Sequence, residues 1–173
     1  MTEQPPATPD DLFALLEKMG IETVTHEHEA VFTVEESADV TAKIPGGHTK
    51  NLFVKDKKDN FFLIVAENHA RLPLNKIHRL IGAQSRVSFG IAEMLMELLG
   101  VEPGSVNAFA PMNDHKCRIQ VIIDEPLMEF DKINCHPLTN TMTTTISRDD
   151  LLRFLESVGH PAKVVRLSVE DDA

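Results

Sequence analysis

The sequence predicts a single mixed α/β domain in which a curved, barrel-like mixed β-sheet has helices packed on its outside. Two observations favour this class. The chain has 173 residues, of which 42% are apolar, and this is enough for one domain with a sizeable core. Segments with strand-like and helix-like apolar spacing follow one another without a regular βαβ alternation. We expect residues 1–173 to form one domain, with loose ends at 1–8 and 169–173.

Helices are predicted where apolar residues recur every three or four positions, usually with a glycine after them. The run Thr8-Pro9-Asp10-Asp11 is a typical helix start, because threonine caps a first turn and proline fits its first position. Ser147 begins the last helix as a cap of the same kind. The expected helices cover residues 12–19, 34–40, 74–81, 92–99 and 151–158.

Strands are predicted from short runs of β-branched and aliphatic residues between turn-forming residues. Two hairpins are expected, one turning at 56–59 and one at 136–140. The long connection over 101–114 contains Pro103, Gly104 and Pro111, and long loops of this kind often carry function. The expected strands cover residues 21–25, 50–55, 60–66, 87–89, 118–124, 133–136, 141–146 and 164–167.

Charge is unevenly distributed along the chain. The net charge is −10, which argues against DNA binding and against non-specific binding of nucleic acid. From Lys43 to Arg86, however, nine lysines and arginines stand against three acidic residues, a net of +6, whereas the remainder carries −16. This basic island indicates a local anion site. The alternative is a solvated strand edge, since residues 55–59 have the composition of a charged hairpin turn.

The N-terminus leads to an expectation about location. It is acidic and rich in proline, unlike a signal peptide. No apolar run in the sequence approaches the roughly 18–20 residues that are needed to span a bilayer. We therefore expect a cytoplasmic protein with no membrane partner.

Lys50 is the residue that most needs an explanation. The Gly46-Gly47 turn places it at the start of a strand whose apolar part covers residues 52–54. Because burying an ammonium group is costly, such a lysine faces solvent, pairs with a carboxylate or binds an anionic ligand. The sequence alone leaves these possibilities open. His26 and His28, by contrast, are expected on an ordinary polar strand face.

Metal and thiol chemistry can be considered from residue types alone. His115, Cys117, Cys135 and His136 are the possible zinc ligands. Adjacent residues of a strand point to opposite faces, so Cys135 and His136 cannot easily share an ion or act as a nucleophile and its base. Cys117 is expected inside an apolar strand. We therefore predict no metal site and no cofactor.

A third group of residues combines a cation, a glycine loop and a histidine turn. Lys50 offers a positive charge for a phosphate, beside the amide of Asn51. The loop at 104–107 exposes backbone N–H groups that could hold an oxyanion, and His136 could orient a hydroxyl or a water. Together these groups suit hydrolysis of an ester attached near a phosphate. Taken singly, each has a structural explanation as a turn, a surface histidine or a solvated lysine.

Several sequence blocks occur in an order that is found in one known family. They are Gly47-His48-Thr49-Lys50-Asn51-Leu52-Phe53, residues 98–106, Asn113-Asp114, His136-Pro137-Leu138-Thr139-Asn140-Thr141, and residues 150–155 with Gly159-His160-Pro161. From about residue 12 to residue 167 the chain thus resembles the freestanding prolyl-tRNA editing proteins of the YbaK/ProX deacylase superfamily. Within that superfamily it looks most similar to the branch that clears alanine from mischarged tRNA-Pro.

The resemblance implies an activity and a partner. The activity is hydrolysis of the ester between an amino acid and the 3′-terminal adenosine of tRNA, without a cofactor. The partner is the acceptor end of a mischarged tRNA, and a prolyl-tRNA synthetase or an elongation factor could meet the protein in passing. The essential lysine of the family falls on Lys50, which would engage the terminal phosphate and place the ester. Asn51 and His136 match other functional positions.

The same resemblance raises a question about the glycine loop and the amino-acid pocket. The loop begins at Gly104 and continues through Ser105, Val106 and Asn107, but Ala108 stands where the family has proline. A small apolar pocket would admit alanine and exclude proline by size. The candidates for its wall are Phe32, Thr33, Val106 and Ala108, with core packing as the alternative for Phe32 and Val106. Removal of cysteine or serine, or binding of aminoacyl-tRNA without turnover, remain alternatives.

Overall fold

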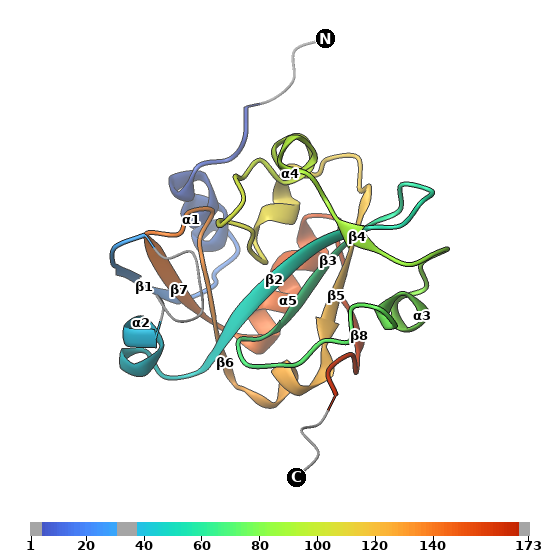
Figure 1. The fold of residues 1–173 in the computed structure, drawn as a ribbon. Helices are drawn as coiled ribbons and strands as arrows, with labels where there is room; N and C mark the ends of the chain where they lie inside the picture. The colour runs from blue at the N-terminus through green and yellow to red at the C-terminus, as the bar shows by residue number, and fades with distance from the viewer. Residues whose placement is uncertain (1–4, 31–37, 170–173) are drawn as a thin grey trace.

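The computed structural model describes residues 5–30 and 38–169, and Figure 1 shows a central sheet with helices around it. The predicted mixed α/β class is confirmed. The helices are α1 (Pro9–Lys18), α2 (Ala38–Lys43), α3 (Ile77–Ile81), α4 (Ala92–Leu99) and α5 (Arg148–Ser157), with 3-10 turns η1 (Ala110–Asn113) and η2 (Glu125–Glu129). The strands are β1 (Thr23–Glu27), β2 (Gly47–Lys55), β3 (Phe61–Glu67), β4 (Ser88–Phe89), β5 (Ile119–Asp124), β6 (Lys132–Cys135), β7 (Met142–Ser147) and β8 (Lys163–Val165).

The strands form one mixed sheet in the order β1-β7-β6-β2-β3-β5-β8, with β4 paired to β2. The two predicted hairpins are confirmed, since β2 pairs antiparallel with β3 and β6 with β7. Parallel pairs join β2 to β6, β3 to β5 and β5 to β8. Among the residues that the structure describes, β1 and β8 do not pair with each other, so the sheet is open rather than a closed barrel.

Helices cover the two faces of the sheet unequally. On one face, α1, α4 and α5 bury the larger core, to which β2 contributes Phe53. On the other face, α3 buries Ile77 and Ile81 against Val54, the next residue of β2. This smaller core involves β2, β3 and β5. Strands β1, β7 and β6 and the start of β2 continue the α3 face of the sheet, but α3 does not cover them. Polar residues gather on this uncovered part of the face.

Several element boundaries differ from the sequence-based prediction. The helix expected over 34–40 is seen as α2 over Ala38–Lys43, and residues 34–37 lie outside the described residues. The helix expected from residue 74 begins at Ile77, because the N–H groups of residues 76 and 77 first form a turn onto the carbonyl of Pro73. The last strand ends at Val165 rather than at 167, where Leu167 packs into the smaller core instead.

The ends that we expected to be loose are anchored in part. The backbone N–H of Ala7 donates to Oδ1 of Asn113 (2.8 Å), and Thr8 forms a capping box with Asp11 at the start of α1. At the other end the N–H of Val169 donates to the carbonyl of Arg71 (2.9 Å). No helix within residues 5–30 and 38–169 is long and apolar enough to cross a membrane.

Candidate functional site

The register of four strands places a row of polar side chains on the face that α3 leaves uncovered. His48 on β2 is the partner of Asn134 on β6, Asn134 is the partner of Thr145 on β7, and Thr145 is the partner of Val24 on β1. Partners in adjacent strands share a face of the sheet. Oγ1 of Thr145 donates to Oδ1 of Asn134 at 2.5 Å, which confirms that these two side chains lie together.

A second row lies two residues further along and contains the predicted site. Lys50 follows His48 by two residues and His136 follows Asn134 by two, so each shares the face of the residue before it. Thr143 and His26 are partners in this row. The structure therefore places Lys50 and His136, which are 86 positions apart in the sequence, on one sheet face. The sequence led us to expect that the lysine and the histidine act together, and that joint action stays a prediction.

Lys50 is half-buried, and its ammonium group has an uncharged partner. Nζ donates to the carbonyl oxygen of Ala70, in the connection that follows β3. Within the described part of the chain, no carboxylate pairs with this ammonium group. A neutral carbonyl satisfies one donor but leaves the positive charge without a counter-charge. Lys50 is half-buried rather than fully exposed, and among residues 5–30 and 38–169 it has no carboxylate partner, so its ammonium group can receive an anionic group.

Asn51 points to the opposite face from Lys50. Its strand partner is Val65 of the larger core, whereas the partner of Lys50 is Ala66. The Oδ1 atom of Asn51 is buried and accepts no hydrogen bond from the residues that the structure describes. A buried acceptor without a donor costs about 1–3 kcal/mol. The alternation of β2 therefore separates two residues that the sequence suggested as one pair.

The ring of His136 is held in one tautomer. Nδ1 lies 2.9 Å from the carbonyl oxygen of Met142, so this nitrogen carries the proton that is donated. Burial lowers the pKa of His136, although the bond to Met142 opposes the shift, and repulsion from His28 and His48 lowers it further. Nε2 forms no hydrogen bond within the described residues. The neutral ring consequently presents Nε2 as an acceptor.

His28 and His48 surround His136, and sequence reasoning gave neither of them a role. The ring of His28 lies edge-on to that of His136, with centroids 6.1 Å apart, and its Nε2 lies 2.8 Å from Oγ1 of Thr143. Nε2 of His48 donates to the carbonyl of Ile44 (2.7 Å). His28 lies one residue beyond the end of β1, so of the two histidines that we expected on a polar strand face only His26 lies within the strand. The position of His48, two residues before Lys50, was the signal available in the sequence.

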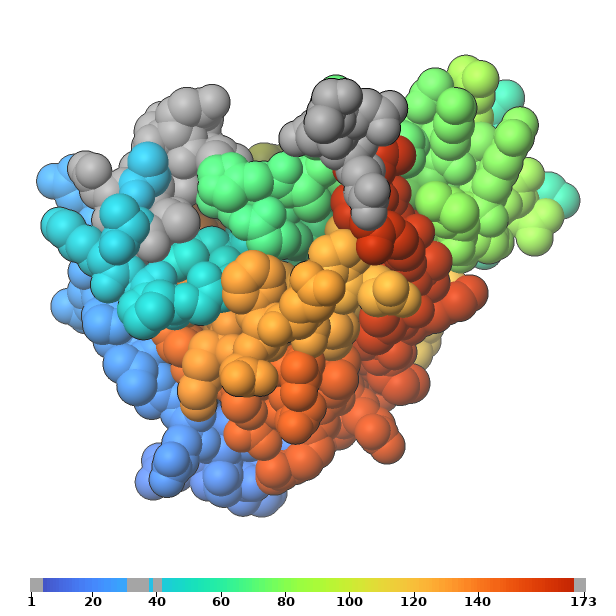
Figure 2. All heavy atoms as spheres, turned by 90° about the horizontal axis from the view of Figure 1, so that it is seen from below, coloured from blue at the N-terminus to red at the C-terminus, as the bar shows by residue number. Residues whose placement is uncertain are grey.

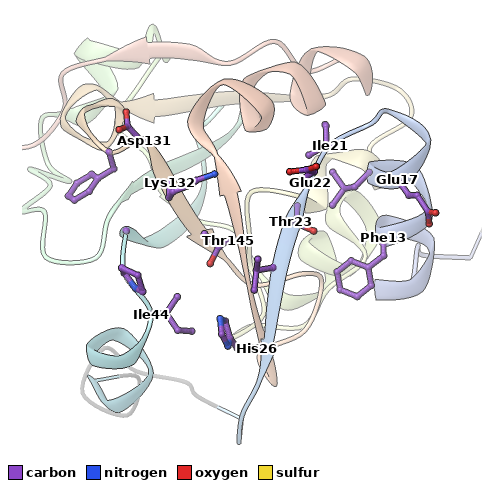
Figure 3. Close-up of a pocket in the computed structure, with 15 residues that line it drawn as sticks. Phe13, Glu17, Ile21, Glu22, Thr23, His26, Ile44, Asp131, Lys132 and Thr145 are labelled. Atoms are coloured by element: carbon purple, nitrogen blue, oxygen red, sulfur yellow. The ribbon is translucent and has the colours of Figure 1, made fainter.

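A groove of about 900 Å³ continues this sheet face toward α1 (Figure 3). In Figure 3 the side chains of Ile44, His26 and Thr145 lie close together between the α2–β2 connection and β1. Neither Lys50 nor His136 lines the groove, but His26 reaches it from the second row. Its acidic residues are Glu17, Glu22 and Asp131, with Lys132 as the one lysine among the lining residues. Because like charges repel, these carboxylates make the groove unsuitable for a phosphate and leave that role to the Lys50 end.

The Gly104 loop is braced by its own residues. Gly104 adopts a positive φ of 94°, and the N–H of Ser105 donates to the carbonyl of Glu102 (3.0 Å). The side chain of Asn107 is fully buried, donates to the carbonyl of Ser105 (2.8 Å) and accepts from the N–H of Phe109 (2.9 Å). These bonds fix the loop where the missing proline would have stiffened it.

The structure does not place the loop residues on an exposed pocket wall. Ala108 is fully buried in the larger core, and Val106 packs against that core. Core packing, the alternative considered for Val106, is what the structure shows for both residues. The other two pocket candidates, Phe32 and Thr33, lie outside the described residues. The wall of an amino-acid pocket therefore remains a prediction.

The structure separates the residues considered for zinc or thiol chemistry. Cys135 is buried in the larger core, where burial raises its pKa to about 12, while His136 faces the other side of the sheet. Cys117 is exposed, with a positive φ of 53°, and it precedes β5 rather than lying inside it, which corrects our expectation. No group of three or more His, Cys, Asp or Glu side chains in residues 5–30 and 38–169 is arranged to hold a metal ion.

The fold and the sheet face that carries Lys50 and His136 can be compared with known families. Residues 28–154 match the family model described as "Aminoacyl-tRNA editing domain", and the chain belongs to that family, within the YbaK/ProX superfamily. The match begins at His28, so it covers His48, Lys50 and His136.

Individual relatives agree with this family assignment. The chain is 37% identical over 152 residues to a prolyl-tRNA synthetase associated domain-containing protein 1 of Danio rerio, covering 87% of this chain and 82% of that protein. It is 27% identical over 157 residues to the prolyl-tRNA editing protein ProX of Acetoanaerobium sticklandii, covering 90% and 95%. A crystal structure described as a "putative trans-editing enzyme for prolyl tRNA synthetase" superposes with a TM-score of 0.70 at 22% identity, covering 95% and 99%, and shows the same fold.

Proposed function

We propose that this protein is a trans-editing hydrolase that cleaves the ester of mischarged aminoacyl-tRNA, with alanyl-tRNA-Pro as its substrate. Membership of an aminoacyl-tRNA editing family supports a tRNA substrate, and the names of the relatives support tRNA-Pro. The observation that carries the proposal is the placement of Lys50 and His136 on one sheet face, with the charge of the first and the Nε2 of the second available to a ligand.

Lys50 binds the phosphate of the terminal nucleotide in this proposal. Its ammonium group exchanges the carbonyl of Ala70 for a phosphate oxygen, so a neutral hydrogen bond is replaced by a charge-assisted one. The bond fixes the 3′-terminal ribose and thereby places the ester. Lys50 acts neither as a nucleophile nor as a Schiff-base amine, because an aminoacyl ester is activated enough for direct attack by water.

His136 orients the attacking water or the neighbouring ribose hydroxyl through Nε2, which accepts a hydrogen bond. The water oxygen bonds to the ester carbonyl carbon, and the carbonyl oxygen becomes an oxyanion. The bond from that carbon to the ribose oxygen then breaks, and the proton lost by the water reaches the ribose oxygen. The products are the free amino acid and a tRNA with both terminal hydroxyls restored.

Backbone N–H groups of the 104–108 loop stabilise the oxyanion in this proposal, and the braced conformation of the loop supports such a role. Asn51 faces the larger core rather than the face of Lys50 and His136, so in this proposal it takes no hydrogen bond from the substrate held on that face. A pocket formed with Phe32 and Thr33 selects alanine by excluding the larger proline.

The test is deacylation of a panel of charged tRNA-Pro. Incubation of the protein with alanyl-, seryl-, cysteinyl- and prolyl-tRNA-Pro should release alanine fastest and leave prolyl-tRNA-Pro intact. Release of serine or cysteine instead would support the proposed hydrolase activity but change the amino acid that we assign to the substrate. Binding of the charged tRNAs without release of any amino acid would show that the protein is a binding module and overturn the proposed activity.

A further inference from the structure

The turn between β2 and β3 is a fixed platform for lysines. Asp56 is buried beneath it, with Oδ1 accepting the N–H groups of Lys58 and Asn60 (both 2.9 Å) and Oδ2 accepting the side-chain amide of Asn60 (2.8 Å). The carboxylate of Asp56 is therefore held by hydrogen bonds inside the turn. Lys57 and Lys58 stand on its exposed outer side.

A second segment of the basic island is fastened to the same turn. The N–H of Gln84 donates to Oδ2 of Asp56 (2.8 Å), and the N–H of Lys57 donates to Oγ of Ser85 (2.8 Å). These bonds bring Arg86 to the turn. Figures 1 and 2 both show the turn and the α3 region together at the same end of the molecule.

We call this surface the basic patch, formed by Lys57, Lys58, Lys76, Arg79 and Arg86. All five side chains belong to exposed residues, and none of them forms an ion pair with any residue that the structure describes. Lys55 differs, because its Nζ pairs with Asp59 at 3.1 Å. The five cations thus keep their charge available to an external partner.

The basic patch is separate from Lys50 but rigidly connected to it. Both lie on or beside β2, which runs from Gly47 to Lys55 without interruption. At about 3.3 Å per residue, roughly 17 Å separate Lys50 from Lys55, where the turn begins. A ligand that reaches from one to the other must be extended and negatively charged along its length.

We infer that the basic patch binds the phosphate backbone of the substrate RNA, several nucleotides before the ester that Lys50 positions. This inference rests on the proposed function. The five cations are spread over a turn, a helix and a connection and do not converge on one point, so they fit a chain of phosphates better than a single one. The acidic remainder of the protein, with its net charge of −16, repels RNA elsewhere and confines it to this surface.

The experiment measures binding of an uncharged RNA stem-loop that ends in single-stranded CCA, by fluorescence anisotropy at several salt concentrations. The variant Lys57→Ala/Lys58→Ala/Arg86→Ala should bind about tenfold or more weakly. Its plot of log affinity against log salt should be shallower by about 2–3, since each phosphate contact contributes a slope of about 0.9. Thermal melting checks that the variant is folded.

The matched control is Lys18→Ala/Lys116→Ala/Lys163→Ala, which removes three exposed positive charges elsewhere. It should leave the salt slope within the error of the parent protein. Equal effects of the two triple variants, or an unchanged slope in the first, would overturn the assignment.

A turnover measurement separates this inference from the proposed function. The patch variant should raise KM for alanyl-tRNA-Pro while leaving hydrolysis of the alanyl ester of adenosine unchanged. If the parent protein hydrolyses neither substrate but its RNA affinity still depends on the patch, the proposed activity fails and the docking surface stands. If the parent protein hydrolyses both substrates and the patch variant behaves like the control variant, the docking surface is wrong while the proposed activity stands.

Discussion

Nδ1 of His136 lies 2.9 Å from the carbonyl oxygen of Met142, across the turn that joins β6 to β7. Because a carbonyl can only accept, this contact assigns the proton of the neutral ring to Nδ1. It leaves Nε2 as the acceptor on the sheet face that carries Lys50. A main-chain contact inside a hairpin thereby sets the chemical character of a residue at the candidate site.

His136 should give the reaction an acid limb. The neutral ring is the active form, and its pKa is lowered from the ordinary value of 6.5 by burial, so activity should persist below pH 6.5 and fall as pH drops through the lowered pKa. The pH profile of kcat/KM for alanyl-tRNA-Pro measures this. His136→Gln should lower kcat/KM by about 10²–10⁴-fold and remove the limb. A limb that persists in the variant would assign the titration to another group.

Lys50→Ala should lower kcat/KM by about 10–200-fold, since a hydrogen bond to a charged group contributes about 1.5–3 kcal/mol. The fold should keep its melting temperature, because only one bond to a main-chain carbonyl is lost. Lys55→Ala is the control, as Lys55 lies on the same strand and pairs with Asp59. If both variants show wild-type turnover, Lys50 has no part in placing the substrate.

Asn51→Leu should separate stability from activity. The change removes a buried oxygen that lacks a donor, so the free energy of unfolding should rise by up to about 1–3 kcal/mol while turnover stays close to that of the parent protein. The control is Asn134→Leu. In the parent protein the amide of Asn134 donates to the carbonyl of Pro45 and accepts from Thr145. That change should lower stability. Urea titration and the deacylation assay measure both, and a less stable Asn51→Leu protein would show that the amide is satisfied in solution.

Asp56 should contribute a pH-dependent part of the stability. Burial alone would raise its pKa, but hydrogen bonds from three neighbouring residues lower it to about 2. An unfolded aspartate has a pKa of about 3.9, so the contribution is present above that value and is lost as pH falls toward 2. Asp56→Asn should lower the free energy of unfolding at pH 7 by about 1–3 kcal/mol, because the new amide faces two donors.

Chemical denaturation of the parent protein and of Asp56→Asn between pH 2 and pH 7 would measure this dependence. The two curves should converge as pH falls below about 4. Asp59→Asn is the control, since Asp59 is exposed and its ion pair with Lys55 contributes little. Parallel curves for the parent protein and Asp56→Asn would contradict the prediction.

Local patterns in the sequence were sufficient to locate most of the helices and strands, though not all of their boundaries. Apolar spacing and glycine stops located α1, α4 and α5, because helix formation depends on neighbours three and four residues away. They failed for Cys117, whose positive φ belongs to a turn that apolar spacing does not reveal. The helix α3 begins later than predicted, after a turn in which the N–H of Lys76 donates to the carbonyl of Pro73.

The sequence by itself determined the candidate residues: a lysine at the head of an apolar strand, a histidine in a turn and a basic island in an acidic chain. Only the tertiary structure decided which of them share a face of the sheet. The register of β2, β6 and β7 brought Lys50 to the face of His136 and sent Asn51 to the other side. The burial of Asp56 turned part of the island into an outward-facing patch. Register and burial depend on contacts between residues distant in the chain, so no local pattern contains them.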